Sequence, residues 1–236
     1  AQVDASIGGK TGINTTHGKN LVGSFYQPKA VICDLAYLNS LPQEEIKNGF
    51  AEIIKYAFIC NKDIYNLLLE HKKSFSSYQF DTKNNAFLDL VYHCAKSKSD
   101  VVSSDEKEAG LREILNFGHS IGHVIEKNNH FKIPHGKAVA FGMLIECALA
   151  YALGKLDLEI VYKLKTMLGF YHFLDDLDES VFDQLHNGLT QDKKAKQGKV
   201  PILVPEHIGN HQKIWLPDQH QLKDMLELAK EECLHD

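Results

Sequence analysis

Apolar residues recur every three or four positions through most of the chain, the spacing that places them on one face of an α-helix. The first such segment follows Ser40-Leu-Pro-Gln43, where a capping-box serine and glutamine accompany a proline in the first helical turn. We therefore expect a mainly helical body. The periodicity predicts helices over residues 40–59, 63–71, 85–103, 111–127, 135–154, 158–168 and 218–234.

The first part of the chain departs from this pattern. Residues 1–38 carry glycines, prolines and short β-type runs such as 30–33, the composition of loops and strands at the edge of an α/β unit. A second β-like run covers 199–204, after the turn signal Gln197-Gly198. The fold class predicted is α/β plus all-α, with an α/β segment over 1–38 and a helical domain over 39–236.

Composition and charge narrow the range of functions. The 236 residues are 44% apolar and 24% charged, as in an ordinary folded protein. The 31 acidic and 26 basic residues give a net charge of −5, which argues against nucleic acid as a partner. No apolar run approaches the roughly 18 residues of a membrane span, and the five scattered cysteines form no CxxC pair. These features predict a cytoplasmic protein with reduced thiols.

Two histidines stand four residues apart in Leu115-Asn-Phe-Gly-His119-Ser-Ile-Gly-His123. On a helix both imidazoles project from one face, which suits a metal ion or a metal-bound substrate. Ser120 excludes the HExxH pattern of metalloproteases. His135 begins the next predicted helix, whose positive end favours the neutral imidazole that binds metal.

Glu52 is the candidate carboxylate for the same site. Metal sites with an open position commonly combine imidazoles with a carboxylate. Glu52 lies among apolar neighbours in Gly49-Phe-Ala-Glu52-Ile-Ile-Lys55-Tyr56, where a buried carboxylate needs a partner, and Lys55 falls one turn further on. The alternative is that the histidines form an ordinary core or surface pair, because the chain contains 13 of them.

Arg112 is the sole arginine, so it alone offers a planar, bidentate guanidinium. It lies seven residues before His119, two helical turns away on about the same face, with Asn116 between them. This alignment suggests a carboxylate or phosphate held beside the metal. A structural ion pair with Glu113 or with a neighbouring helix is the alternative.

Two lysine-containing segments are less specific. Gly8-Gly-Lys10-Thr11, with Lys19 and Asn20 nearby, suits the approach of a phosphate or a nucleotide, and a plain Gly-rich turn is an equal alternative. Asp192-Lys193-Lys194 is either a solvated turn or a segment that reaches a ligand.

Taken in order, these segments resemble the 3-dehydroquinate synthase family. The family has an N-terminal Rossmann-like NAD domain, then a helical metal domain, with the active site between them. The resemblance implies that residues 1–38 are the last part of the NAD-binding domain. Residues 39–236 would then form the helical domain that binds metal and substrate. The chain starts at Ala1 within a Gly-rich stretch, so we expect it to be part of a longer protein. The matching elements are Val3-Asp-Ala-Ser-Ile-Gly-Gly-Lys-Thr-Gly12, Gly18-Lys-Asn20, Ser24-Phe-Tyr-Gln-Pro28, Gly49 to Tyr56, Lys98 before Val101-Val102, Asp105-Glu106, Gly110-Leu-Arg112, Leu115 to His123, His135-Gly136 and Asp192-Lys-Lys194.

The resemblance also implies roles for individual residues. The implied metal ligands, for zinc or cobalt, are Glu52, His119 and His135. The implied catalytic residues are His123, as the proton-handling group, with Lys55, Lys98, Arg112 and Asn116. The implied substrate-binding residues are Lys10, Asn20, Lys55, Lys98, Arg112, Asn116 and one of Lys193 and Lys194. The implied NAD-binding residues are Asp4, Lys10, Lys19, Asn20 and Ser40.

The activity implied is that of a carbon–oxygen lyase in the shikimate pathway, on the route to chorismate and the aromatic amino acids. It converts 3-deoxy-D-arabino-heptulosonate 7-phosphate to 3-dehydroquinate and phosphate, and it uses NAD catalytically. The expected partners are this sugar phosphate and a second copy in a homodimer. The alternatives are another NAD- and metal-dependent sugar-phosphate cyclase, or a metal-binding fragment without catalysis.

Overall fold

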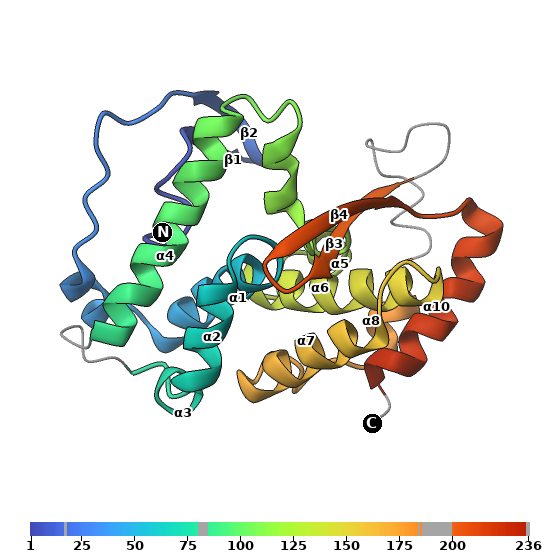
Figure 1. Cartoon of the computed structure of the whole chain (residues 1–236). Helices are drawn as coiled ribbons and strands as arrows, with labels where there is room; N and C mark the ends of the chain where they lie inside the picture. Colours follow the sequence, from blue (N-terminus) through green and yellow to red (C-terminus); the bar gives the residue numbers. More distant parts are fainter. Residues whose placement is uncertain (17, 80–84, 184, 186–199, 235–236) are drawn as a thin grey trace.

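A computed structural model describes the chain except for residues 17, 80–84, 184, 186–199 and 235–236 (Figure 1). In the described part the fold is mainly helical, with two small antiparallel hairpins. No helix of this part is long and apolar enough to cross a bilayer. The elements are β1 (Lys10–Thr15), β2 (Gly18–Phe25), η1 (Leu35–Ser40), α1 (Gln43–Ile59), α2 (Lys62–Glu70), α3 (Lys72–Phe75), α4 (Asn85–Ser104), η2 (Leu111–Asn116), α5 (His119–Asn128), α6 (His135–Ala152), α7 (Leu158–Phe170), α8 (Glu179–Asp183), β3 (Pro201–His207), β4 (Asn210–Trp215) and α10 (Gln219–Leu234).

Helix α6 is the centre of the fold. Its residues from Ala138 to Ala150 are all buried, as expected for a helix that is apolar on every side. Helices α1, α5, α7 and α10 and strand β3 pack around it. The β1–β2 hairpin and α4 lie at one end of the molecule and α10 at the other, with α7 beside α6 between them (Figure 1). Helix α6 is therefore enclosed by the elements that pack around it.

Close backbone contact joins α5 to α6. A Cβ added at Gly142 would lie 2.0 Å from the carbonyl oxygen of Gly118. Gly118 itself has a φ of +77°, the left-handed region that favours glycine. These two glycines allow the start of α5 to lie directly on α6.

The β3–β4 hairpin has two different faces, because side chains alternate along a strand. Ile202 and Val204 of β3 and Ile214 of β4 are buried in the core. Leu203 and Trp215 lie on the other side of the strands and line a cavity described below. The hairpin therefore forms one wall of that cavity.

The expected helical segments are confirmed, apart from two details. The helix predicted over 111–127 is instead two helices, η2 and α5, because Phe117 and Gly118 leave helical geometry between them. The prediction of a capping box at Ser40 is also wrong. Helix α1 begins after Pro42, and the Ser40 hydroxyl donates to the carbonyl of Tyr37 instead.

The β structure differs from the expectation in two places. Residues 30–33 form no strand, because no described strand lies beside them to pair with. Strand β4, which the periodicity did not predict, pairs with β3 in an antiparallel hairpin. The beginning of the predicted run 199–204 is outside the described residues. The two hairpins do not form a Rossmann-like sheet, so the NAD-domain remnant over 1–38 and the boundary at 38/39 stay predictions.

Candidate metal and substrate site

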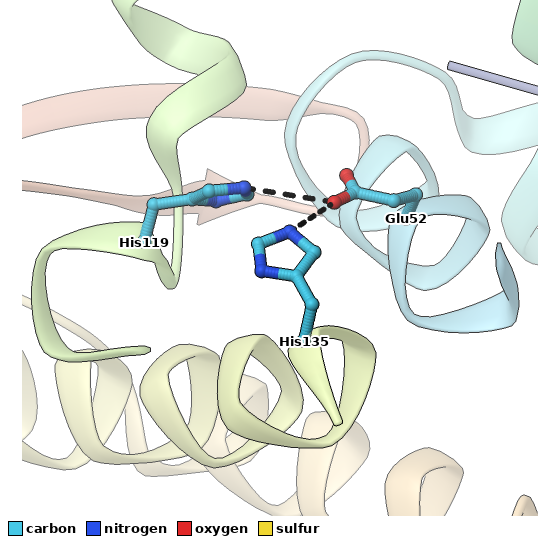
Figure 2. A group of neighbouring side chains, drawn as sticks. All are labelled: Glu52, His119 and His135. Carbon is cyan, nitrogen blue, oxygen red and sulfur yellow. Dashed lines mark ion pairs between the residues drawn. The ribbon is translucent and has the colours of Figure 1, made fainter. Parts of the chain in front are cut away.

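Three side chains from three helices converge on one point (Figure 2). Glu52 lies in the middle of α1, whereas His119 and His135 are the first residues of α5 and α6. Glu52 Oε1 lies 3.6 Å from His119 Nε2 and 3.5 Å from His135 Nε2. One ligand atom from each residue falls within 4.8 Å of the other two. This is a set of two imidazoles and one carboxylate around a common centre.

Glycine explains how His135 comes so near to Glu52. A Cβ added at Gly136 would lie 2.6 Å from the Cα of Asn48, so only glycine allows the start of α6 to contact the backbone of α1. Asn48 stands one helical turn before Glu52. The close approach of the two helices thus carries His135 to the carboxylate.

Hydrogen bonds orient both imidazoles. His119 Nδ1 lies 3.1 Å from the carbonyl oxygen of Phe117, and His135 Nδ1 lies 3.2 Å from Glu126 Oε2. When each Nδ1 carries the proton and donates it to these acceptors, each Nε2 presents a lone pair toward Glu52. Neutral imidazoles oriented in this way by an outer partner are the usual form of metal-binding histidine.

The charges are balanced by Lys55, which is buried and forms an ion pair with Glu52 one turn earlier on α1. Burial disfavours the Glu52 carboxylate, but Lys55 and the two imidazoles hold its pKa well below the usual value. The pKa of Lys55 is raised, since attraction to Glu52 and Asp4 outweighs the effect of burial. The carboxylate is therefore ionised and available as a ligand.

His135 is not the neutral imidazole that its position at a helix start predicts. Hydrogen bonds to the carboxylates of Glu126 and Glu52 raise its pKa to about 9. These two negative charges outweigh the partial positive charge at the start of α6. In the metal-free protein His135 is thus protonated at neutral pH, and a metal ion would replace that proton.

The donor set fits a divalent transition metal. Two nitrogen ligands and one oxygen ligand, with coordination positions left for water or substrate, are the pattern of catalytic rather than structural zinc sites. Cobalt accepts the same ligands. No sulfur ligand is among the three.

His123 lies next to this cluster. Its ring centroid is 5.4 Å from that of His119 and 6.3 Å from that of His135, onto which it stacks. The residue is exposed. The geometry places a titratable group beside the metal ligands and open to solvent.

A second polar network lies beside Lys55. Asp4 accepts a 2.5 Å hydrogen bond from the hydroxyl of Tyr56, and its carboxylate lies 2.8 Å from Lys98 Nζ. Lys98 also donates to the backbone carbonyl of Asp4. Burial lowers the pKa of Lys98, although Asp4 opposes the shift. Tyr56 ends the segment Gly49 to Tyr56 that carries Glu52, but the sequence pattern does not predict its contact with Asp4.

Lys10 and Asn116 meet at a third carboxylate, Glu108. Asn116 Nδ2 donates to Glu108 at 3.0 Å, and Lys10 forms an ion pair with it. Although burial opposes the shift, these partners lower the pKa of Glu108. They line a cavity of about 630 Å³ that extends to Ser120, the residue after His119, and to Trp215 of the hairpin. The cavity is large enough for a small phosphorylated ligand.

Arg112 does not share a helical face with His119, because the break at Phe117 separates η2 from α5. Its guanidinium is buried and donates to the carbonyl oxygens of Gly8, at 2.7 Å, and of Glu106, at 2.6 Å. The alternative pairing with Glu113 is wrong, since Glu113 pairs with Lys213. Arg112 thus joins the N-terminal glycines to the segment before η2.

The remaining candidates are less informative. Lys19 and Asn20 lie in β2, but their side chains are not among those described. Lys193 and Lys194 lie outside the described residues. Ser40 is exposed and contacts Tyr37.

Two buried carboxylates were missed altogether. Glu126 is 4% exposed and lies on α5, which begins with His119. Glu146 is fully buried and lies on α6, which begins with His135. The signal that identified Glu52, a carboxylate among apolar neighbours, also applies to Glu146 within Leu144-Ile-Glu146-Cys-Ala148. Both contact the histidine-bearing segments, as described below.

Two family sequence patterns match the chain in tandem. The pattern described as 3-dehydroquinate synthase N-terminal covers residues 1–48, and the one described as 3-dehydroquinate synthase C-terminal covers residues 49–195. The C-terminal pattern therefore includes all three residues of the candidate metal centre.

Curated relatives agree with this match. The 3-dehydroquinate synthase of Dictyoglomus thermophilum is 40% identical over 232 residues, which are 98% of this chain and 63% of the relative. That of Corynebacterium efficiens is 40% identical over 220 residues, which are 93% of this chain and 60% of the relative. The chain thus spans somewhat less than two thirds of the length of these relatives.

Solved structures share the fold. ValA (2-epi-5-epi-valiolone synthase) from Streptomyces hygroscopicus subsp. jinggangensis, with NAD⁺ and Zn²⁺ bound, superposes with a TM-score of 0.83 at 24% identity, over 98% of this chain and 63% of its own. A 2-deoxy-scyllo-inosose synthase complexed with carbaglucose-6-phosphate, NAD⁺ and Co²⁺ superposes with a TM-score of 0.82 at 24% identity. The superposition covers 98% of this chain and 63% of that one.

Proposed function

The chain belongs to the 3-dehydroquinate synthase family, and from this premise we propose that it forms the metal- and substrate-binding part of such an enzyme. The reaction converts 3-deoxy-D-arabino-heptulosonate 7-phosphate to 3-dehydroquinate and phosphate, with NAD used catalytically. A hydroxyl is oxidised to a ketone, which acidifies the adjacent C–H so that phosphate leaves by β-elimination. Reduction, ring opening and an intramolecular aldol closure follow.

The observation that carries the proposal is the convergence of Glu52, His119 and His135. These residues would hold Zn²⁺ or Co²⁺ and would leave positions open for the substrate. When bound, the metal polarises the hydroxyl that is oxidised and stabilises negative charge on its oxygen.

Other residues of the chain act on the substrate directly. His123, exposed beside the ligands, accepts or relays the hydroxyl proton. Lys55 and Lys98 are buried cations next to this centre, and they offset the substrate's negative charge. Lys10 and Asn116 exchange their contacts with Glu108 for contacts with the substrate in the adjoining cavity. The family resemblance adds Arg112 and one of Lys193 and Lys194 to the set that holds the carboxylate and phosphate. In this role the Arg112 guanidinium exchanges its bonds to the carbonyls of Gly8 and Glu106 for bonds to the substrate.

NAD binds on the N-terminal side of the site. We assign its contacts to Lys10, Lys19 and Asn20 of the β1–β2 hairpin, to Ser40 of η1 and to Asp4, which precedes the hairpin in the chain. The enzyme acts as a homodimer in the cytoplasm, on the shikimate pathway.

Phosphate release from 3-deoxy-D-arabino-heptulosonate 7-phosphate tests the proposal. It is measured with NAD and with Zn²⁺ or Co²⁺, for this chain, for the chain extended upstream of Ala1 and for the His119→Ala variant of each. Turnover that requires NAD, metal and His119 supports the synthase. Turnover only with a sugar phosphate that lacks a carboxylate would indicate another cyclase of this fold. Metal binding without turnover in either form would indicate a non-catalytic metal-binding module.

A further inference from the structure

Glu126 faces His135 across the turn that joins α5 to α6. It lies near the end of α5, two helical turns after His119, and its side chain is buried. Its Oε2 is 3.2 Å from His135 Nδ1, the nitrogen that points away from Glu52. The two histidines of the candidate centre are thus flanked by different acceptors, a backbone carbonyl for His119 and a side-chain carboxylate for His135.

This contact selects one tautomer and one ring orientation. A neutral imidazole carries a single N–H, and a carboxylate next to Nδ1 keeps the proton there. Once a metal ion replaces the second proton, the lone pair of Nε2 is directed toward Glu52, 3.5 Å away. Rotation of the ring would lose the hydrogen bond and leave a buried carboxylate without it, which costs free energy.

The orientation of His135 depends more on its hydrogen-bond partner than the orientation of His119 does. The imidazole of His135 is half-exposed, with 46% of its side chain accessible, whereas the side chain of His119 is only 12% accessible. The surrounding protein therefore restricts His119, while the orientation of His135 depends on its hydrogen bonds.

We propose that Glu126 is a positioning residue of the metal centre, which holds the His135 imidazole in its metal-binding tautomer and orientation. The inference rests on the proposed metal site. Glu126 does not contact the metal; it acts through His135, in the same way as carboxylates behind metal-bound histidines in other proteins.

A purely structural role is the competing explanation, because Glu126 also lies at the α5–α6 turn. The backbone carbonyl of Glu126 accepts from the N–H of Phe131, and this bond does not involve the side chain. A substitution at Glu126 therefore keeps the hydrogen bond that closes the turn. The two explanations differ in whether metal affinity falls in a protein that remains folded.

The experiment measures Zn²⁺ affinity by chelator competition, and the visible spectrum of bound Co²⁺, on the full chain. We expect Glu126→Ala to weaken Zn²⁺ binding about 10–100-fold and to alter the Co²⁺ spectrum. Glu126→Gln keeps an acceptor without the charge, so we expect a smaller loss. Asp175→Asn is the matched control, because Asp175 forms an exposed pair with His172 (3.6 Å) in the loop after α7, and we expect no change.

A double-mutant cycle shows whether Glu126 acts through His135. In the His135→Ala background, Glu126→Ala should add no further loss of affinity, because the imidazole that it orients is gone. Equal additional loss in both backgrounds, or unchanged affinity in folded Glu126→Ala, would overturn the inference. Failure of the unsubstituted chain to bind metal would instead refute the metal site itself. Far-ultraviolet circular dichroism and thermal unfolding establish that each variant is folded.

Discussion

The carboxylate of Glu146 accepts a 2.7 Å hydrogen bond from the backbone N–H of Gly118, the residue immediately before His119. A second, longer bond of 3.3 Å comes from the N–H of Ile121. Glu146 thus satisfies N–H groups at the start of α5, which have no partner within the helix. The position of His119 depends on a buried side chain of α6.

We expect Glu146→Ala to lower the free energy of unfolding by about 1–3 kcal/mol, because it leaves buried N–H groups unsatisfied. Glu146→Gln retains an acceptor oxygen and should lose less. Urea denaturation of the metal-free protein measures both. Equal stability of Glu146→Ala and the unsubstituted chain would show that water replaces the carboxylate.

Gly118 should tolerate no side chain. Its φ of +77° already costs another residue about 1–2 kcal/mol, and an added Cβ would also lie 2.7 Å from the carbonyl oxygen of Val139. Gly154 is the matched control, with a φ of +64° and nothing within 4 Å of an added Cβ. We expect Gly118→Ala to be clearly more destabilising than Gly154→Ala in chemical denaturation. Similar losses would show that α5 moves to make room.

The stability of the metal-free protein should depend on pH through His135. Its pKa rises from an ordinary value near 6.5 to about 9 in the folded protein, so folding favours the protonated form. The stabilisation is complete below about pH 6.5 and disappears as the pH rises through about 9. Thermal unfolding with a chelator, compared with His135→Gln, should show a difference that shrinks across this interval. A difference that grows with pH would contradict the assignment.

The hydroxyl of Tyr56 should contribute more to stability than that of another buried tyrosine. It donates to the Asp4 carboxylate, and hydrogen bonds to charged groups contribute about 1.5–3 kcal/mol. Tyr78 donates at 2.6 Å to the neutral carbonyl of Tyr171, where about 0.5–1.5 kcal/mol is usual. We therefore expect Tyr56→Phe to destabilise the protein more than Tyr78→Phe in urea denaturation. The reverse order would show that the hydrogen bond from Tyr56 adds little to the ion pair between Asp4 and Lys98.

The helical body could be predicted from the sequence because its signals are local. The period of apolar residues identified α1, α4, α6 and α10 within a few residues, and Gly154 marks the end of α6 with a positive φ. The separation of Arg112 from His119 could not be found in this way. It depends on the contact of Gly118 with α6, which joins segments far apart in the sequence.

The candidate ligands were also identifiable, but their surroundings were not. Glu52, His119 and His135 have residue types that indicate metal binding and occupy recognisable positions on helices. The charged state of His135 is set by Glu126 and Glu52, which reach it only through tertiary packing. The partners of Lys10 and Asp4 depend on packing in the same way, as Glu108 and Tyr56 lie more than fifty residues away in the sequence.

The buried position of α6 has a consequence for ligand capture. His135 begins this helix, and Glu146 further along it holds the start of α5, where His119 lies. The backbone of both histidines therefore cannot shift without opening the core. An ion arriving at the centre would meet donors that are already ordered, and its binding would lose little chain entropy. The amide protons in the middle of α6 should accordingly be among the slowest in the protein to exchange with deuterium.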